Sequence, residues 1–175
     1  MLNLEKSLAA FNEAKTLMPG GVNSPVRSYA NVDCNPPFIA KAKGDRIFDI
    51  DGNEYIGYLT IPALGLELPV MAELDSARLE TAPCRYYGTP NDNLVIAGHN
   101  YSRHFGRLHD LRIEDPIMLT DTAGGKHLYR VCEIEILAGT AITQMLDSGY
   151  DLTLFTCTYG GRDRIAVRCE SLSGK

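Results

Sequence analysis

Three side chains that could act together on a carbonyl group lie far apart in this sequence. Cys157 ends the segment Thr153-Leu-Phe-Thr-Cys157. Arg164 follows it after a short link, and His99 lies far upstream. A thiol can act as a nucleophile, an imidazole can transfer protons, and a guanidinium can stabilise a developing oxyanion. If the three groups meet in space, the chemistry that they suit is acyl transfer on a peptide carbonyl.

The strands predicted at 151–157 and 163–170 carry aliphatic residues at alternate positions. Neighbouring side chains of a strand point to opposite faces, so a buried aliphatic face leaves Cys157 and Arg164 pointing outward. Tyr159-Gly160-Gly161 predicts a tight return between the two strands. We therefore expect the thiol and the guanidinium to be neighbours across a hairpin. The adjacent Arg162 is a weaker candidate than Arg164 because it lies within the turn.

His99 ends an apolar run, at the carboxyl end of a predicted strand, where a side chain is well placed for function. Gly98, just before it, permits the close approach of another backbone or of a ligand. His104 and His109 follow at five-residue intervals. That spacing does not stack side chains on one helix face, and no fourth ligand is visible, so no metal site is predicted. We interpret these two histidines as groove or surface residues.

The composition is that of an ordinary globular protein, with 175 residues, 45% hydrophobic and 22% charged. A formal charge of −5 argues against nucleic acid as a partner, because phosphate binding needs a basic surface. No run approaches the 18 or so apolar residues of a membrane span, and no signal segment opens the chain. The chain as given is therefore expected to be soluble.

Five cysteines form no CxxC pair, which is the spacing of neither a zinc knuckle nor a disulfide-rich scaffold. Cysteine is commonly a small buried residue, so most of them are expected to be structural. Strand parity places Cys169 in the core, and it places Cys132 there together with Leu128, Ile134 and Ile136. The cysteines are Cys34, Cys84, Cys132, Cys157 and Cys169.

The first third of the chain predicts a small separate unit. Residues 1–18 suggest an amphipathic helix (stripe Leu4, Leu8, Phe11, Met18) with Asn3 as its N-cap, and Pro19-Gly20-Gly21 stops it. Asp51-Gly52 is a strong hairpin signal. The strand-like pieces around it are 38–42, 46–50 and 54–58. One helix and a small meander cannot hold a core alone, so this unit should pack on something else.

From about Gly57 the pattern changes to many short strands separated by turn signals. The candidate strands are 57–62, 66–71, 93–99, 116–121, 127–137, 151–157 and 163–170. Short helical turns are predicted near 74–81 and 141–146. Residues 57–175 suit a single small closed β-barrel, because closure removes exposed strand edges.

The motifs Val95-Ile-Ala-Gly-His99-Asn, Thr153-Leu-Phe-Thr-Cys157 and Arg164-Ile-Ala-Val resemble those of the sortases, in the family's chain order. Gly57-Tyr-Leu-Thr-Ile-Pro62 resembles their first barrel strand, and the resemblance covers essentially all of 57–175. It implies a mainly β fold: a closed barrel of about eight strands with short helices, plus the amino-terminal helix and hairpin as an appendage.

The same resemblance implies a cysteine transpeptidase that cleaves a sorting signal, often of LPXTG type, in surface proteins. Cys157 would form a thioacyl-enzyme, His99 would transfer protons, and Arg164 would stabilise the oxyanion or hold the substrate backbone. Thr156 and Asn100 would contact substrate. The acceptor would be an amine of the cell wall or of a pilus, and no cofactor or metal is expected.

The amino-terminal segment carries a second resemblance. Met18–Arg27, Asn35–Ile39 and Asp49–Tyr55 resemble the start of glutamate-1-semialdehyde aminotransferase, over roughly residues 1–56. In that family Arg27 would lie near the substrate carboxylate. That enzyme needs several hundred residues and a distant Schiff-base lysine, so we interpret 1–56 as a non-catalytic fragment that binds no pyridoxal phosphate.

Three alternatives remain open: a cysteine hydrolase that passes the acyl group only to water, a catalytically silent peptide-binding barrel, and an aminotransferase relic. Sortases normally carry a membrane anchor beside the catalytic domain, and here the aminotransferase-like fragment occupies that position. A native sortase is expected at the outer face of the bacterial plasma membrane. The short link between Cys157 and Arg164 leaves the sorting motif and the sortase class open.

Overall fold

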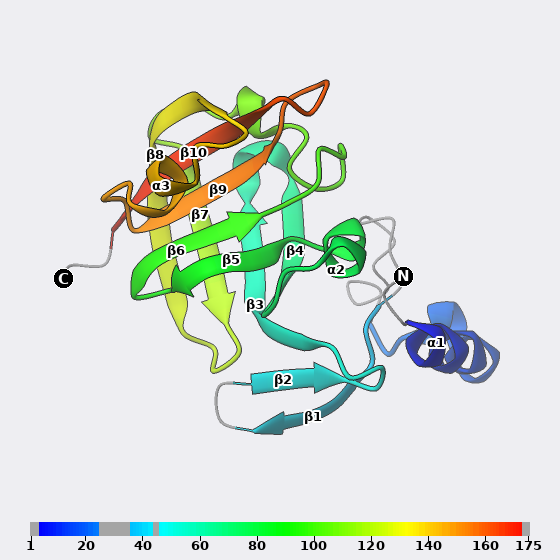
Figure 1. Ribbon diagram of the computed structural model, residues 1–175. Coiled ribbons are helices and arrows are strands. Elements are labelled where there is room, and N and C mark those ends of the chain that lie inside the picture. Colours follow the sequence, from blue (N-terminus) through cyan, green and yellow to red (C-terminus); the bar gives the residue numbers. More distant parts are fainter. Residues whose placement is uncertain (1–3, 25–35, 44–45, 173–175) are drawn as a thin grey trace.

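The computed structural model describes residues 4–24, 36–43 and 46–172, and it has a barrel and a smaller appendage (Figure 1). The barrel strands are β3 (Glu54–Ile61), β4 (Leu66–Met71), β5 (Cys84–Thr89), β6 (Asp92–Ala97), β7 (Pro116–Asp121), β8 (Lys126–Ala138), β9 (Leu152–Cys157) and β10 (Asp163–Ser171). They follow the order β3-β4-β5-β6-β9-β10-β8-β7, and β7 pairs back with β3. The predicted closed barrel of about eight strands is confirmed.

Two parallel pairings make the barrel mixed. β4 pairs with β5, and β6 pairs with β9, in parallel, while the other neighbours are antiparallel. Because β6 and β9 run in the same direction in register, Ala97 lies beside Phe155 and the carboxyl ends of both strands meet at one end of the barrel. The residues that follow these strands are therefore brought together.

The barrel interior is filled by the aliphatic side chains that alternate along the strands. Leu152 and Leu154 of β9 and Val167 and Cys169 of β10 all belong to this core, so the predicted parity of both strands is correct. Phe105 and Leu108, from the β6–β7 connection, close the core and are fully buried. Burial of this kind stabilises by about 25 cal/mol per Å² of apolar surface.

Short helices cover the outside of the barrel. α2 (Ser76–Thr81) begins at Asp75, whose side chain accepts a hydrogen bond of 2.8 Å from the Arg78 backbone N–H, as an N-cap does. α3 (Ile142–Leu146) lies on the outer face of β9 and β10. There it packs Met145 against Val95 and Ala166 in a second, smaller cluster. The single-turn helices η3 (Pro62–Leu64) and η4 (Leu108–Asp110) lie in connections. Both predicted helical turns of the barrel are present.

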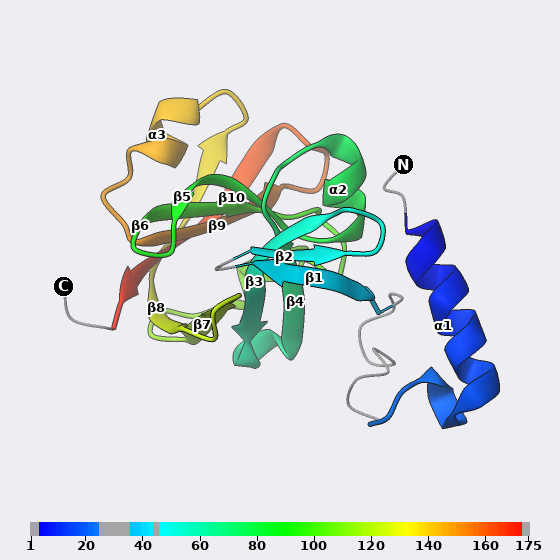
Figure 2. The same cartoon turned by 90° about the horizontal axis from the view of Figure 1, so that it is seen from below.

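The appendage consists of α1 (Glu5–Leu17), the turn η1 (Pro19–Gly21), and the hairpin of β1 (Ile39–Lys43) and β2 (Arg46–Asp49). Figure 2 shows α1 standing to one side of the barrel, with the hairpin leading into β3. Asp51 of the β2–β3 turn binds the start of the helix: its carboxylate accepts hydrogen bonds from the backbone N–H groups of Lys6 and Ser7, at 2.9 Å each. The predicted N-cap Asn3 and the predicted Arg27 lie outside the described residues.

The amphipathic helix prediction is only partly correct. Phe11 is buried, but Leu8 and Met18 of the predicted apolar stripe are exposed, and Leu17 is 74% exposed. Polar contacts to the hairpin turn fix the start of the helix. A second polar group holds the hairpin: buried Asp49 accepts hydrogen bonds from the Tyr55 hydroxyl (2.9 Å) and the Asn53 side chain (2.8 Å).

Two strand predictions need correction. β5 was not predicted, because the Tyr86-Tyr87 segment on it is exposed and has no apolar alternation. The strands predicted at 54–58 and 57–62 are one continuous strand, β3. Tyr55, at the appendage end of β3, pairs with Met71 and packs with Cys84 and Ala82. The junction of the two predicted units is therefore part of the barrel.

The core face predicted for β8 is also wrong. Arg168 of β10 pairs with Glu133 and Cys169 pairs with Val131, so Cys132 is skipped at a β-bulge. The bulge shifts the alternation, and Tyr129 and Val131 occupy the core in place of the predicted set. Of that set, Ile134 packs against the core, Cys132 is partly exposed, and Leu128 and Ile136 are exposed, Ile136 by 70%.

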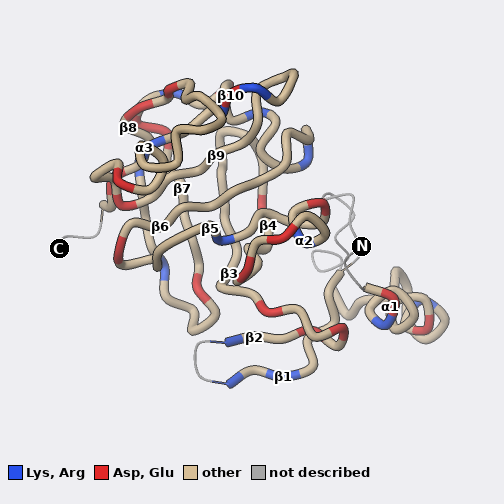
Figure 3. The backbone as a smooth tube through the Cα atoms, in the orientation of Figure 1, with Lys and Arg blue, Asp and Glu red and all other residues tan. Residues whose placement is uncertain are grey.

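Charges of both signs are scattered over the barrel and the appendage (Figure 3). Within residues 4–24, 36–43 and 46–172, no helix combines the length and apolar character needed to cross a membrane.

Candidate active site

A groove of about 280 Å³ opens at the end of the barrel where β6 and β9 finish and β10 begins. His99, Cys157 and Arg164 all line this groove. The parallel pairing of β6 and β9 carries His99 and Cys157 to the same end, and the β9–β10 hairpin adds Arg164. The three side chains that the sequence singled out thus share one open site.

Cys157 and Arg164 are direct partners across the β9–β10 hairpin. Each is partly exposed, on the face away from the core. The hairpin turns sharply through Gly160 and Gly161, whose φ angles of 103° and 76° are left-handed values that favour glycine. The Nη1 group of Arg164 donates to the carbonyl oxygens of Gly161 (3.1 Å) and Asp163 (3.0 Å). These bonds hold the guanidinium against the backbone of the turn, on the residue that pairs with Cys157.

The His99 ring is held by an aromatic neighbour. It stacks on Tyr101, with 4.6 Å between ring centroids and 25° between planes. The predicted close approach at Gly98 is made by a core side chain: a Cβ there would lie 2.4 Å from Cδ2 of Phe105. Glycine at this position therefore lets the Phe105 ring pack directly beneath the backbone that carries His99.

Thr156 and Asn100, the two predicted substrate contacts, differ in position. Thr156 lines the groove, is 1% exposed, and its hydroxyl has no hydrogen-bond partner within the described residues. Asn100 is partly buried and is not among the residues that line the groove. The structure thus brings Thr156, but not Asn100, to the three chemical groups.

Much of the groove wall is apolar, and little in the sequence indicates this. Ile142 of α3 and Leu74 near α2 stand beside the site although 56% and 39% of their surface is exposed. Tyr86 and Phe155 meet edge to face, with 5.4 Å between ring centroids. Exposed apolar side chains around a nucleophile suit a substrate that presents apolar side chains of its own. Their signal in the sequence is weak, because their helices are short.

The other described cysteines are poor nucleophiles. Burial raises the pKa of Cys84 to about 12 and also raises the pKa of Cys169, and both thiols are fully buried. Burial likewise raises the pKa of Cys132, and its thiol lies away from the groove. Since the thiolate is the reactive form, Cys157 is the candidate among these four. Cys34 lies outside the described residues.

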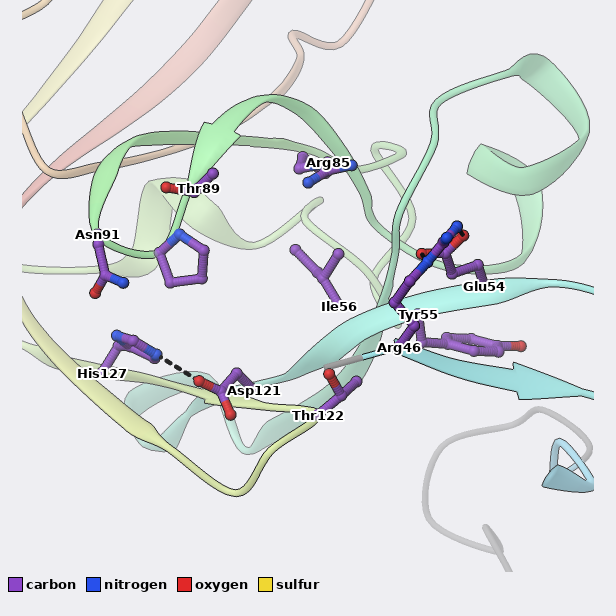
Figure 4. A pocket seen from close by; sticks show the side chains of 11 residues that line it. Arg46, Glu54, Tyr55, Ile56, Arg85, Thr89, Asn91, Asp121, Thr122 and His127 are labelled. Atoms are coloured by element: carbon purple, nitrogen blue, oxygen red, sulfur yellow. Dashed lines mark hydrogen bonds and ion pairs between the residues drawn. The ribbon is translucent and has the colours of Figure 1, made fainter. Parts of the chain in front are cut away.

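A second, larger cleft of about 580 Å³ lies where the appendage meets the barrel (Figure 4). Arg46 lines it from the appendage, and Glu54, Asp121 and His127 line it from the barrel, the last two joined by a 2.9 Å hydrogen bond. No cysteine or serine is among its lining residues. We therefore place the chemistry in the smaller groove, where a nucleophile, a proton carrier and a fixed cation coincide.

The other histidines do not join the groove. His104 is buried, and its Nε2 lies 3.1 Å from the carbonyl oxygen of Thr81; His109 is exposed. The interpretation of His104 as a groove or surface residue is wrong, because its ring fills a gap behind α2. Among the described residues no group of three histidine, cysteine, aspartate or glutamate side chains could hold a metal ion.

The fold and the groove define a closed β-barrel with a thiol, an imidazole and a guanidinium at one end. The sortase domain model matches residues 59–172, and the chain belongs to the sortase family, whose members are cysteine transpeptidases.

Solved structures agree with this assignment at the level of the fold. Sortase A from Corynebacterium diphtheriae has a TM-score of 0.64 at 23% identity, covering 98% of this chain and 94% of that one. The Clostridium perfringens sortase D5 transpeptidase has a TM-score of 0.60 at 23% identity, covering 68% and 79%. Sortase C1 from Streptococcus suis has a TM-score of 0.60 at 24% identity, covering 69% and 74%.

Curated relatives match a different part of the chain. Glutamate-1-semialdehyde 2,1-aminomutase 2 of Bacillus velezensis is 63% identical over 59 residues, and the aminomutase of Bacillus subtilis is 61% identical over the same length. The match covers 34% of this chain but only 14% of each relative. The predicted resemblance of the amino-terminal segment to this enzyme family is confirmed, as is its partial extent.

Proposed function

We propose that this chain cleaves a sorting signal of LPXTG type in surface proteins and transfers the acyl group to an amine of the cell wall or of a pilin. The observation that carries the proposal is the cross-strand pair of Cys157 and Arg164 in a groove that His99 also lines. The site of action would be the outer face of the bacterial plasma membrane. Residues 1–56 would serve as a non-catalytic extension.

In the first half-reaction the Cys157 thiolate attacks the scissile carbonyl carbon and forms a C–S bond. The carbonyl oxygen becomes an oxyanion beside Arg164. Nη1 makes all of this guanidinium's hydrogen bonds within the described residues, which leaves Nε and Nη2 for the substrate. Collapse of the intermediate breaks the C–N bond, and protonated His99 gives its proton to the leaving amine. The product is a thioacyl-enzyme.

In the second half-reaction an incoming amine attacks the thioacyl carbon. Neutral His99 takes a proton from that amine, the C–S bond breaks, and the thiolate and imidazolium are restored. Thr156, which precedes the nucleophile in β9, lines the groove. The apolar wall holds the apolar side chains of the sorting signal.

The test is a panel of sorting-signal peptides incubated with the protein, with and without triglycine as acceptor, and analysed by mass spectrometry. The proposal predicts the peptide–triglycine amide when acceptor is present. Cleavage that yields only the free acid at saturating acceptor would make the protein a cysteine hydrolase. Binding of the peptides without any cleavage would make it a silent peptide-binding barrel.

A further inference from the structure

One wall of the groove is formed by α3 and the residue before it, and this helix is too short to be stable by itself. Ala141, Ile142 and Met145, in and next to α3, line the groove. α3 has only five residues, which is far shorter than a helix that is stable by itself in water. Its position must therefore come from contacts with the barrel.

Met145 supplies an apolar contact with Val95 and Ala166, and most of the hydrogen bonds from barrel side chains to α3 come from a buried arginine. Arg168 lies on β10, on the same outer face as Arg164, and is 1% exposed. Its Nη2 donates to the carbonyl oxygen of Gln144 (2.9 Å), and its Nη1 donates to that of Met145 (3.3 Å). The side-chain amide of Asn93 donates to the next carbonyl, that of Leu146.

The last carbonyls of a helix carry partial negative charge and have no partner within the helix. In α3 three consecutive carbonyls are bound by side chains of the barrel, two of them by one guanidinium. The planar guanidinium presents its donors to both carbonyls in a fixed geometry, whereas a lysine ammonium is a point charge with rotatable donors.

The remaining donors of Arg168 tie it to the strands on either side. Its Nε donates to Oε1 of Glu135 on β8 (2.7 Å), and its Nη1 donates to Oγ1 of Thr153 on β9 (3.0 Å). The carboxylate of Glu135 offsets the cost of burying the charge. Arg168 thus joins α3 to both neighbours of β10, and it does not itself line the groove.

We propose that Arg168 is a positioning residue that fixes α3 as the apolar wall of the groove, and so sets the affinity for the peptide without touching the reacting atoms. This inference rests on the proposed function and extends it to a residue that no motif of the sequence marks. Glu135 supports Arg168 by holding the guanidinium in its buried position.

The test compares Arg168→Lys with Arg130→Lys, a matched change on the exposed surface, where Arg130 makes ion pairs with Glu114 and Glu170. Arg168→Lys keeps the charge but loses the planar guanidinium. It should raise KM for the sorting-signal peptide roughly tenfold, the scale of a lost charge-assisted hydrogen bond, and leave kcat within about twofold. Arg130→Lys should change neither constant.

Hydrogen exchange gives a readout that does not depend on activity. In Arg168→Lys the amides of residues 141–147 should exchange faster, while those of the β9–β10 hairpin should not. The rate at which iodoacetamide modifies Cys157 should also stay unchanged. If Arg168→Lys does not fold, Glu135→Gln serves as the second variant. It should also raise KM and speed exchange over residues 141–147, but by less.

Unchanged exchange over 141–147 together with an unchanged KM would overturn the inference. A fall in kcat with an unchanged KM would also overturn it, because Arg168 would then act on the chemistry. If the wild-type protein makes no amide product, the proposed function fails. The exchange measurement then still decides whether Arg168 holds α3 in place.

Discussion

The barrel and the appendage are built on different principles. The barrel buries a continuous set of aliphatic side chains, and its outer face carries a groove with three chemically active groups. The described part of the appendage buries Phe11 but few other apolar side chains, and carboxylates organise it: Asp49 holds the hairpin and Asp51 holds the start of α1. The barrel is held together by apolar burial, and the appendage by polar contacts.

The comparison shows that the part of a chain with the highest sequence identity to known proteins need not be the part that carries the candidate active site. The appendage matches aminomutases at about 60% identity, yet the match covers about a seventh of them. The barrel resembles solved sortases at identities below 25%, yet it carries the whole groove. The two parts meet inside β3, where Tyr55 pairs with Met71. Strand β3 joins the two parts, but the residues that line the groove all come from the barrel part of the chain.

The largest expected effect is a loss of transfer activity, with the folds of the barrel and the appendage left intact. His99→Ala removes the proton carrier, and general acid–base catalysis contributes roughly 10²–10⁴-fold, so the rate of amide formation should fall by about 10³-fold. His109→Ala, a change at an exposed histidine, is the matched control and should keep the wild-type rate. The measurement is the initial rate of transfer to triglycine. A fall of less than tenfold in His99→Ala would contradict the assigned role.

The next prediction compares substitutions of two arginines in the β9–β10 hairpin. Arg164→Ala should lower kcat by roughly 10²–10³-fold, because a positioned donor to the oxyanion is lost. Arg162→Ala should have no effect, because Arg162 is exposed in the turn and does not line the groove. Steady-state kinetics on the pair of variants provides the comparison. Equal losses in both variants would show that the net charge of the hairpin matters, and not the position of Arg164.

A pH effect on stability is expected in the barrel. Burial of the ring, with help from the charge of Arg103, lowers the pKa of His104 from 6.5 to about 4. Between these values the unfolded chain binds the proton and the folded chain does not, so stability is full above pH 6.5 and falls as the pH drops toward 4. The loss at pH 4 should reach about 3 kcal/mol.

Urea unfolding at pH 7.5 and pH 5.0 measures this loss. His104→Gln, which keeps an amide nitrogen for the Thr81 carbonyl, should show a smaller difference between the two pH values than the wild type. Equal differences in the two proteins would mean that His104 is not the group responsible.

The smallest effect is expected in the appendage. Asp51→Ala removes the carboxylate that accepts from the Lys6 and Ser7 N–H groups, so α1 should lose about 1 kcal/mol of local stability. Faster hydrogen exchange in residues 5–17, with an unchanged transfer rate, is the expected result. Glu13→Ala, an exposed change on the same helix, serves as the control. A clear fall in the transfer rate of Asp51→Ala would show that the appendage takes part in catalysis.

The features that could be predicted from the sequence are the ones that local patterns encode. Alternation along β9 and β10 gave the outward direction of Cys157 and Arg164, and the apolar run before His99 gave its strand. The sequence could not give contacts made between distant residues. Asp51 stabilises a helix that begins more than forty positions earlier, and the bulge at Cys132 depends on the partner strand.

The groove wall was missed for the same reason. α3 is placed by Arg168, whose partners come from β8, β9 and α3 itself, and no local pattern shows that a surface-facing arginine of a strand will be buried. β5 was missed because its exposed tyrosines carry no alternation, although one of them, Tyr86, lines the groove. Local patterns thus predicted the candidate reacting groups that line the groove, but not the apolar wall beside them.

The central claim is that Cys157 carries the acyl group between donor and acceptor. Acid quenching during turnover of a sorting-signal peptide, followed by intact mass measurement and peptide mapping, tests it directly. The account predicts an added mass equal to the acyl half of the peptide, located on Cys157, removed by hydroxylamine and absent in Cys157→Ala. An adduct on another cysteine, or peptide transfer that persists in Cys157→Ala, would contradict it.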